Sequence, residues 1–197
     1  RQTLLFSATF PKQIQSIANN IMQQPEMVQV AATHDNNSIK QHFYKVADHA
    51  ARIDAVQALL FAHTPESAVV FCNTRKETQT LADTLLQRGF SVIALHGDLE
   101  QRERDQTLIR FANKSVSILV ATDVAARGLD IDSLDAVINY EIARDPEVHI
   151  HRIGRTGRAG SKGIACTLYT EQDRHKVGLL EQTLAITVNP LPIPEID

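Results

Sequence analysis

Short runs of β-branched and apolar residues alternate with helical patterns along most of this chain. Runs at residues 3–6, 68–72, 91–95, 117–121, 136–139 and 163–169 have the length and composition of buried strands. An all-parallel sheet needs long crossover connections and must be covered on both faces, so the alternation predicts helices on either side of one sheet. The expected fold is therefore α/β, with three layers around a mainly parallel sheet.

The expected helices lie between these strands. Ile14, Ile17 and Ile21 recur at helical spacing after Pro11, a residue that is favoured in a first helical turn. Further helical patterns cover residues 52–62, 76–88, 101–112, 146–153 and 172–184. Strands and helices thus follow one another in the order that βαβ units require.

A polar stretch at residues 31–38 interrupts this alternation and is rich in turn-forming residues. We expect it to be a linker between two domains. The single strand and helix in residues 1–30 cannot bury their apolar faces alone, so we expect them to be the end of a preceding domain. Residues 39–186 are expected to form a complete α/β domain, and the proline-rich residues 187–197 an extended tail toward a further region.

Composition and charge exclude several classes of protein. The net charge of -3 gives no global signal for polyanion binding, so any contact with nucleic acid must come from a local basic patch.

Cys72 and Cys166 lie in apolar runs, which favours buried, reduced thiols and a cytoplasmic location. No apolar stretch approaches the ~20 residues that span a bilayer, so we expect no membrane partner. The eight histidines show no spacing typical of a zinc site, so we expect no metal.

The densest positive charge lies in the octapeptide His-Arg-Ile-Gly-Arg-Thr-Gly-Arg at residues 151–158. No acidic residue occurs between His149 and Gly163. Arginines at this spacing, with glycines that allow close backbone approach, suit bidentate recognition of phosphate oxygens. A solvated basic loop is the alternative interpretation, and the rarity of the octapeptide argues against it.

The octapeptide resembles the sixth motif of the DEAD-box RNA helicases. Four more segments resemble motifs of that family, in the family's order: Ser7-Ala8-Thr9, Val70-Phe71-Cys72-Asn73-Thr74, Gln101-Arg102-Glu103-Arg104, and Ala121-Thr122-Asp123 through Arg127-Gly128-Leu129-Asp130. A chance match of five motifs in order is negligible. Residues 96–102, 104–108 and 145–149 are similar to the bacterial DbpA type. The resemblance implies a second RecA-like domain, preceded by the end of the first.

The resemblance implies roles at the nucleotide. Arg155 and Arg158 match the catalytic arginine fingers, which bind ATP at its γ-phosphate and neutralise charge during phosphoryl transfer. Asp130 matches the residue that accepts a hydrogen bond from the ribose, with a helix or turn cap as the alternative. The residues that match the coupling between ATP and RNA sites are Ser7, Thr9 and His151.

The resemblance also implies a track for single-stranded RNA. The residues that match sugar-phosphate contacts, which we call the RNA track, are Asn73, Arg75, Gly97, Arg104 and Thr122. A short polar side chain or a glycine N–H at the end of a strand can reach a phosphate. Turn or cap chemistry is the alternative for Asn73 and Thr122. Contacts to the backbone predict little base preference.

The implied function is that of the C-terminal half of an ATP-dependent RNA helicase core. The sequence contains neither a Gly-Lys-Ser/Thr phosphate loop nor Asp-Glu-Ala-Asp, so ATP and Mg²⁺ are expected to bind mainly to the preceding domain. Alone, this chain is expected to bind no cofactor and to be inactive. Expected partners are that domain and RNA, specifically ribosomal RNA during large-subunit assembly, with the protein a monomer. The alternative is a non-enzymatic RNA-binding module with a RecA-like fold.

Overall fold

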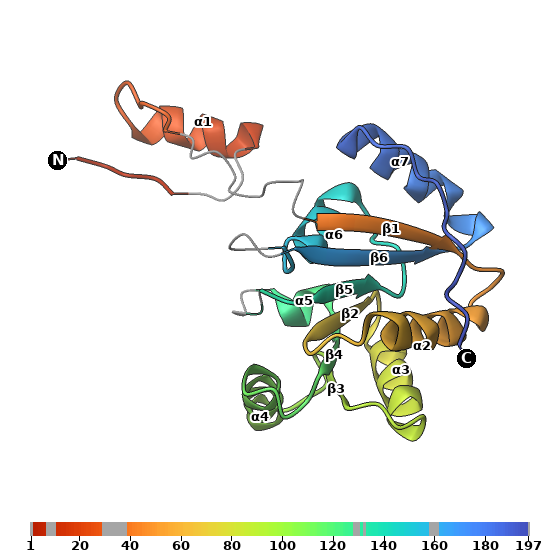
Figure 1. The fold of residues 1–197 in the computed structure, drawn as a ribbon. Helices are drawn as coiled ribbons and strands as arrows, with labels where there is room; N and C mark the ends of the chain where they lie inside the picture. The colour runs from red at the N-terminus through yellow and green to blue at the C-terminus, as the bar shows by residue number, and fades with distance from the viewer. Residues whose placement is uncertain are drawn as a thin grey trace. The chain divides into compact units, whose positions relative to one another are not determined.

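A computed structural model describes residues 2–6, 11–28, 39–127, 131, 133–157 and 162–196, and divides the chain into two compact units, Arg1–Thr33 and His34–Asp197 (Figure 1). The first unit contains helix α1 (Lys12–Ile21), as expected after Pro11. Residues 2–6 form no strand. The strand predicted there is therefore wrong, because the described residues of this unit include no second strand that could complete a ladder. The predicted linker 31–38 lies outside the described residues.

The second unit is built on a six-stranded sheet in which all paired strands are parallel. Its strands are β1 (Ile39–Lys45), β2 (Ala68–Cys72), β3 (Val92–Leu95), β4 (Ile118–Thr122), β5 (Ala136–Asn139) and β6 (Gly163–Tyr169). Their order across the sheet is β1-β6-β5-β2-β4-β3, which Figure 1 shows from top to bottom. The predicted α/β class with a parallel sheet is confirmed.

Helices cover both faces of this sheet. They are α2 (Ala51–His63), α3 (Arg75–Gln87), α4 (Gln101–Ala112), α5 (Asp123–Ala126), α6 (Pro146–Ile153) and α7 (Arg174–Leu184), the last preceded by a 3-10 turn at Glu171–Asp173. Successive side chains of the central strand β2 point to opposite faces of the sheet. Val70 and Cys72 pack with α2 and α3, whereas Val69 and Phe71 pack with α4 and α5. A third apolar cluster joins α7 to β1 and β6. The three-layer prediction is confirmed.

Two elements were not predicted, β1 and α5. The strand β1 contains Lys40, Gln41 and His42 in succession, so its pattern is neither apolar nor alternating. It can tolerate this composition because it lies at the edge of the sheet and, among the described strands, pairs with β6 alone. Helix α5 is a single turn of four residues, too short to produce a periodic pattern.

The C-terminal segment follows the edge of the second unit. Residues 186–196 form no helix or strand, and Figure 1 shows them running past β1 and α2. The backbone N–H of Leu191 donates to the carbonyl of Phe43 over 2.8 Å, and Ile193 packs against the core. Cys72 and Cys166 are both buried and free, as expected. Among the described residues, no helix is long and apolar enough to cross a membrane.

The two glycines Gly163 and Gly178 give a matched test of this structure. A Cβ atom at Gly163 would lie 2.4 Å from the backbone nitrogen of Gly157, whereas one at Gly178, inside α7, would meet no atom within 4 Å. Gly163→Ala should therefore lower the free energy of unfolding by about 1–3 kcal/mol, because backbone must move. Gly178→Ala should raise it by about 0.5–1 kcal/mol through helix propensity. Urea unfolding of both variants measures the difference, and equal effects would contradict the structure.

Candidate functional site

The carboxyl ends of the central strands bring polar residues to one edge of the sheet, which we call the carboxyl edge. Asn73 follows β2, Gly97 lies two residues beyond β3, Thr122 ends β4 with Asp123 directly after it, and Glu141 follows β5 by two residues. Because the strands are parallel, these positions meet at the same edge, where ligands of open α/β sheets bind. Three residues of the RNA track therefore lie on this edge.

A buried arginine, Arg152 of α6, lies at the centre of this edge. Its side chain is 1% exposed. Its Nε donates to Asp123 Oδ1 over 2.6 Å and its Nη2 donates to Asp123 Oδ2 over 2.8 Å. This is a bidentate ion pair of the kind that fixes both partners in orientation as well as in distance.

The rest of the Arg152 guanidinium binds the neighbouring strands. Its Nη2 donates to Asn73 Oδ1 over 2.7 Å, and its Nη1 donates to the carbonyl of Glu141 over 2.8 Å. The guanidinium carbon also lies 5.3 Å from the centre of the Phe71 ring, a cation–π distance. One side chain therefore connects α6 to the ends of β2, β4 and β5.

His149, one turn before Arg152 on α6, joins the same helix to the middle of β1. The ring is fully buried, stacks on Phe43, and its Nε2 lies 3.0 Å from Gln41 Oε1. Burial and the nearby charge of Arg152 lower the pKa of His149 to about 4. The ring is neutral at pH 7. The amide oxygen of Gln41 can only accept, so we assign the ring proton to Nε2.

Sequence reasoning assigned no role to Arg152 or Asp123. A signal was available for both. Arg152 is three residues after His149 in a helical pattern, so the two share a face, and that face is the buried one. Asp123 follows an apolar run that ends in Thr122, the position where a side chain enters the edge of a parallel sheet. A buried arginine needs a partner, and Asp123 is the acid that the topology supplies.

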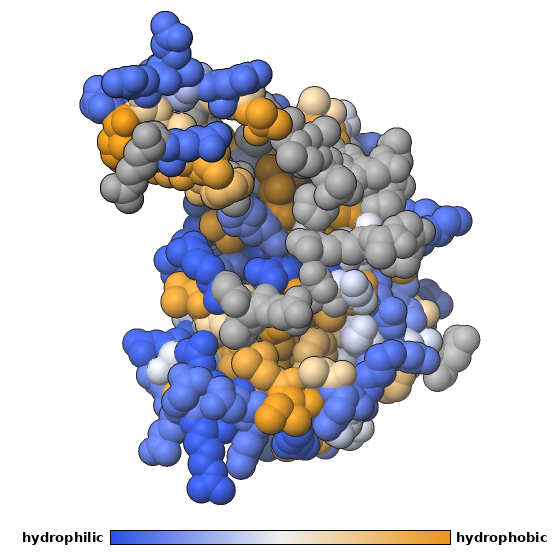
Figure 2. All heavy atoms as spheres, turned by 90° about the vertical axis from the view of Figure 1, so that its left-hand side faces the viewer, coloured by the Kyte–Doolittle hydropathy of each residue, from blue (hydrophilic) through white to orange (hydrophobic). Residues whose placement is uncertain are grey.

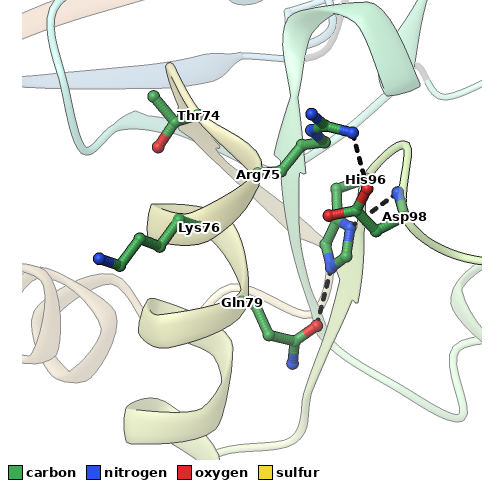
Figure 3. A pocket seen from close by; sticks show the side chains of 6 residues that line it. All are labelled: Thr74, Arg75, Lys76, Gln79, His96 and Asp98. Carbon is green, nitrogen blue, oxygen red and sulfur yellow. Dashed lines mark hydrogen bonds and ion pairs between the residues drawn. The ribbon is translucent and has the colours of Figure 1, made fainter.

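A hollow of about 510 Å³ opens between the ends of β2 and β3. It is lined by Thr74, Arg75, Lys76, Gln79, His96 and Asp98, all labelled in Figure 3. Arg75 donates to Asp98 over 2.6 Å, and the two side chains are 62% and 63% exposed. An exposed pair of this kind is weak, so Arg75 can exchange Asp98 for another anion at little cost.

His96 forms the wall of this hollow. The backbone N–H of Asp98 donates to His96 Nδ1 over 3.3 Å, so the proton lies on Nε2, which donates to Gln79 Oε1 over 2.8 Å (Figure 3). Gly97 stands between these partners, and a Cβ there would lie 3.6 Å from the Arg75 Cδ. Arg75 and Gly97, both in the RNA track, are thus neighbours.

A second, smaller pocket of about 70 Å³ lies beside Arg152. Arg155 and His151 line it, together with Asp123, Arg127 and other residues. The Arg155 guanidinium donates to the backbone carbonyls of Ile131 and Ala126 over 3.3 and 3.4 Å. His151 is exposed on α6. Two residues assigned to ATP chemistry and coupling are therefore placed together.

Of the remaining predicted residues, Thr122 and Arg104 are described by the structure and four others are not. Thr122 is buried and accepts a hydrogen bond from the N–H of Ala125, which makes it the N-cap of α5. Arg104 is half-buried on α4, and its guanidinium forms no hydrogen bond or ion pair with the rest of the described chain. The predicted residues outside the described ones are Ser7, Thr9, Asp130 and Arg158.

Exposed apolar side chains lie on the elements that flank the carboxyl edge. Val124 of α5 is 78% exposed, and Ile109 of α4 is 62% exposed. Figure 2 shows hydrophobic surface among hydrophilic side chains in its lower half, on the side where α4 lies in Figure 1. Surface of this kind suits contact with another protein domain.

Comparison with known proteins shows the family to which this chain is similar. The family described as "Helicase conserved C-terminal domain" matches residues 51–160. The ATP-dependent RNA helicase DbpA of Escherichia coli is 49% identical over 189 residues, which is 96% of this chain and 41% of that protein. The chain thus spans about two fifths of the length of this curated relative.

Two solved structures extend the likeness to the fold. E. coli DEAD-box protein SrmB, bound to regulator of ribonuclease activity A, has a TM-score of 0.73 and 31% identity, over 80% of this chain and 96% of that one. Saccharomyces cerevisiae Dbp5, bound to RNA and ADP BeF3, has a TM-score of 0.82 and 30% identity, over 95% of this chain and 50% of that one. The RecA-like fold is confirmed.

The buried Arg152–Asp123 pair should contribute far more to the free energy of unfolding than the exposed Arg75–Asp98 pair. Asp123→Asn leaves Arg152 buried without a full counter-charge, so it should lower the free energy of unfolding by about 3 kcal/mol. The matched control Asp98→Asn removes the exposed partner of Arg75 and should cost less than about 1 kcal/mol. Urea unfolding followed by circular dichroism measures both. Equal losses would refute the central role of Arg152.

Proposed function

This chain belongs to the helicase conserved C-terminal domain family, as the C-terminal RecA-like domain of a DEAD-box helicase, and on that premise we propose how it works. We propose that it binds the backbone of single-stranded RNA at the carboxyl edge and supplies arginine fingers for ATP hydrolysis. The observation that carries the proposal is the gathering of Asn73, Gly97 and Thr122 at that edge, with Arg75 next to Gly97 and Asn73 bonded to Arg152.

On the nucleotide side, Arg155 has the chemistry that a γ-phosphate requires. Its guanidinium stays charged at all relevant pH values and can donate two parallel hydrogen bonds. The carbonyls of Ile131 and Ala126 orient it at the edge of the small pocket. We propose that the preceding RecA-like domain holds ATP and Mg²⁺, and that closure brings the γ-phosphate to Arg155 and Arg158. Asp130 would then accept from the ribose, and Ser7, Thr9 and His151 would couple the two sites.

On the RNA side, the hydrogen-bonding capacity of the edge is only partly used within the protein. Thr122 Oγ1 accepts from Ala125, and its own O–H remains a donor. Asn73 donates one N–H of its amide to Ile142, which leaves the second for a phosphate. The alternative readings of these two residues, a cap and a turn, are therefore compatible with RNA contact.

Charge for the RNA track would come from Arg75 and Arg104. Because the Arg75 pair with Asp98 is exposed, a phosphate oxygen can replace the carboxylate. Arg104 extends the track along α4. These groups contact phosphates and not base edges, so we expect little base preference. We propose ribosomal RNA of the large subunit as the substrate, as the motif resemblance to the DbpA type implies, with any sequence specificity supplied elsewhere.

The first functional prediction concerns Arg155. In the longer protein that carries both RecA-like domains, Arg155→Ala should slow RNA-stimulated ATP hydrolysis by a factor of about 10³, the low end for a lost arginine finger. RNA binding without nucleotide should change little. Arg174→Ala, an exposed arginine on α7, is the control and should leave both unchanged. Equal losses in hydrolysis and RNA binding would assign Arg155 to RNA instead.

The second functional prediction concerns Arg104. Arg104→Ala should make the slope of log affinity against log salt shallower by about 0.7, the value for one phosphate contact on a single strand. It should weaken binding to unrelated RNA sequences alike. Arg110→Ala, an exposed arginine on the same helix, should change neither quantity. Fluorescence anisotropy at several salt concentrations measures this.

The outcomes of the Arg104 titration are distinguishable. A slope that stays unchanged, or a loss confined to one RNA sequence, removes Arg104 from the track. An equal effect of Arg110→Ala means that α4 acts only through its overall charge. RNA binding by this chain with no ATP hydrolysis by the longer protein would favour the non-enzymatic binding module.

A further inference from the structure

Three side chains that bind metals lie together away from the carboxyl edge. His42 is on β1, Cys166 is its register partner on β6, and His63 is the last residue of α2. One ligand atom from each of the three lies within 4.8 Å of the other two, and His63 Nε2 is 4.0 Å from the Cys166 sulfur. The residues are far apart in the sequence, which is why their spacing predicted no metal site.

The cluster has unsatisfied hydrogen-bonding capacity. The Nδ1 atom of His42 is buried and has no hydrogen-bond partner among the described residues. Such a buried polar atom is costly unless something binds to it. The ring centroids of His42 and His63 are 6.4 Å apart, and Cys166 is fully buried. Two imidazoles and one thiol therefore converge on a place where the buried Nδ1 of His42 has no hydrogen-bond partner among the described residues.

The distance between His63 and Cys166 is close to that in a tetrahedral zinc site, and all three ligand atoms lie within 4.8 Å of one another. Zinc bonds of about 2.0–2.1 Å to nitrogen and about 2.3 Å to sulfur put neighbouring tetrahedral ligands roughly 3.4–3.6 Å apart. The 4.0 Å between His63 Nε2 and the Cys166 sulfur needs only a small closure. Side-chain rotation of His63, at the end of its helix, can supply it. The geometry points to a Zn²⁺ site made by His42, His63 and Cys166, with water as the fourth ligand.

The ligand chemistry selects the ion. Two imidazole nitrogens and one thiolate suit Zn²⁺, whereas Mg²⁺ and Ca²⁺ prefer oxygen ligands. The Cys166 thiol must lose its proton to become a ligand, so binding releases one proton to solvent for each ion bound. No electron is transferred, because zinc is not redox active.

Zinc at this position would cross-link two elements of the fold and so stabilise it. It would join the edge strand β1, which in the described part of the chain forms a ladder with β6 alone, to the end of α2. An ion that binds only the folded state stabilises it in proportion to the logarithm of its concentration above the dissociation constant. The site shares no residue with the carboxyl edge, so this inference stands independently of the proposed function.

The test is a binding titration of the purified chain after metal removal by a chelator. Zn²⁺ should bind with one equivalent per chain by equilibrium dialysis, and should raise the thermal unfolding temperature. Co²⁺ should give the intense visible bands of a tetrahedral site and a thiolate-to-metal charge-transfer band. Mg²⁺ should do neither.

Variants assign the site to these residues. His63→Ala should weaken Zn²⁺ binding at least about 100-fold, beyond the 10–100-fold that follows loss of groups supporting a ligand. Cys166→Ser should remove the charge-transfer band of Co²⁺. His175→Ala, an exposed histidine on α7, is the control and should bind as the wild type does. Circular dichroism checks that each variant is folded, and His63→Ala alone decides if Cys166→Ser does not fold.

Three results would overturn the inference. One is the absence of stoichiometric Zn²⁺ binding to the wild type. Another is binding that His63→Ala leaves unchanged. The third is an equal loss with His175→Ala, which would mean that zinc binds nonspecifically to surface histidines.

Discussion

The buried guanidinium of Arg152 is the interaction on which the arrangement of the carboxyl edge depends. A charge that is 1% exposed is tolerated only when ion pairs and hydrogen bonds replace the water it has lost. Asp123, Asn73 and the carbonyl of Glu141 supply these bonds from three different strand ends. Each of those ends is consequently fixed relative to α6. The parallel sheet brings the strand ends to one edge, and Arg152 fixes the side chains of Asp123 and Asn73 there.

The two arginine–aspartate pairs near this edge, Arg152–Asp123 and Arg75–Asp98, differ in exposure and therefore in role. The Arg152–Asp123 pair is enclosed, bidentate and tied to neighbouring groups, so it serves structure. The Arg75–Asp98 pair is exposed to solvent and joined by a single hydrogen bond, so it can open when a ligand arrives. A surface that binds a polyanion needs both enclosed ion pairs and exposed ion pairs that can open. A rigid frame lowers the entropy lost on binding, while exchangeable cations provide the contacts.

The sequence predicted much of the fold because its apolar runs are short, regular and separated by helical patterns. The helices at Gln101–Ala112 and Pro146–Ile153 were predicted at their observed bounds. The edge strand β1 was not predicted, because one ladder and one partly exposed face impose no strong apolar pattern on it. The strand predicted at residues 3–6 was wrong, because strand propensity is not enough without a neighbour to pair with.

The candidate site was predictable as a location more than as a set of contacts. Motif residues such as Asn73 and Thr122 mark the carboxyl edge from sequence, but not that Asn73 binds Arg152 or that Thr122 caps α5. Those contacts depend on which strand lies next to which, and local sequence does not encode strand order. The cluster of His42, His63 and Cys166 shows the same limit, since only the β1–β6 register brings two of its members together.

The central claim is that RNA binds at the carboxyl edge that Arg152 organises. The most direct measurement is an NMR titration of the isotope-labelled chain with two unrelated single-stranded RNAs. The account predicts that both RNAs shift the same backbone amides, at residues 73–75, 96–98 and 122–123, and leave those of α7 unchanged. Shifts on α7, or shifts at different residues for the two RNAs, would contradict it.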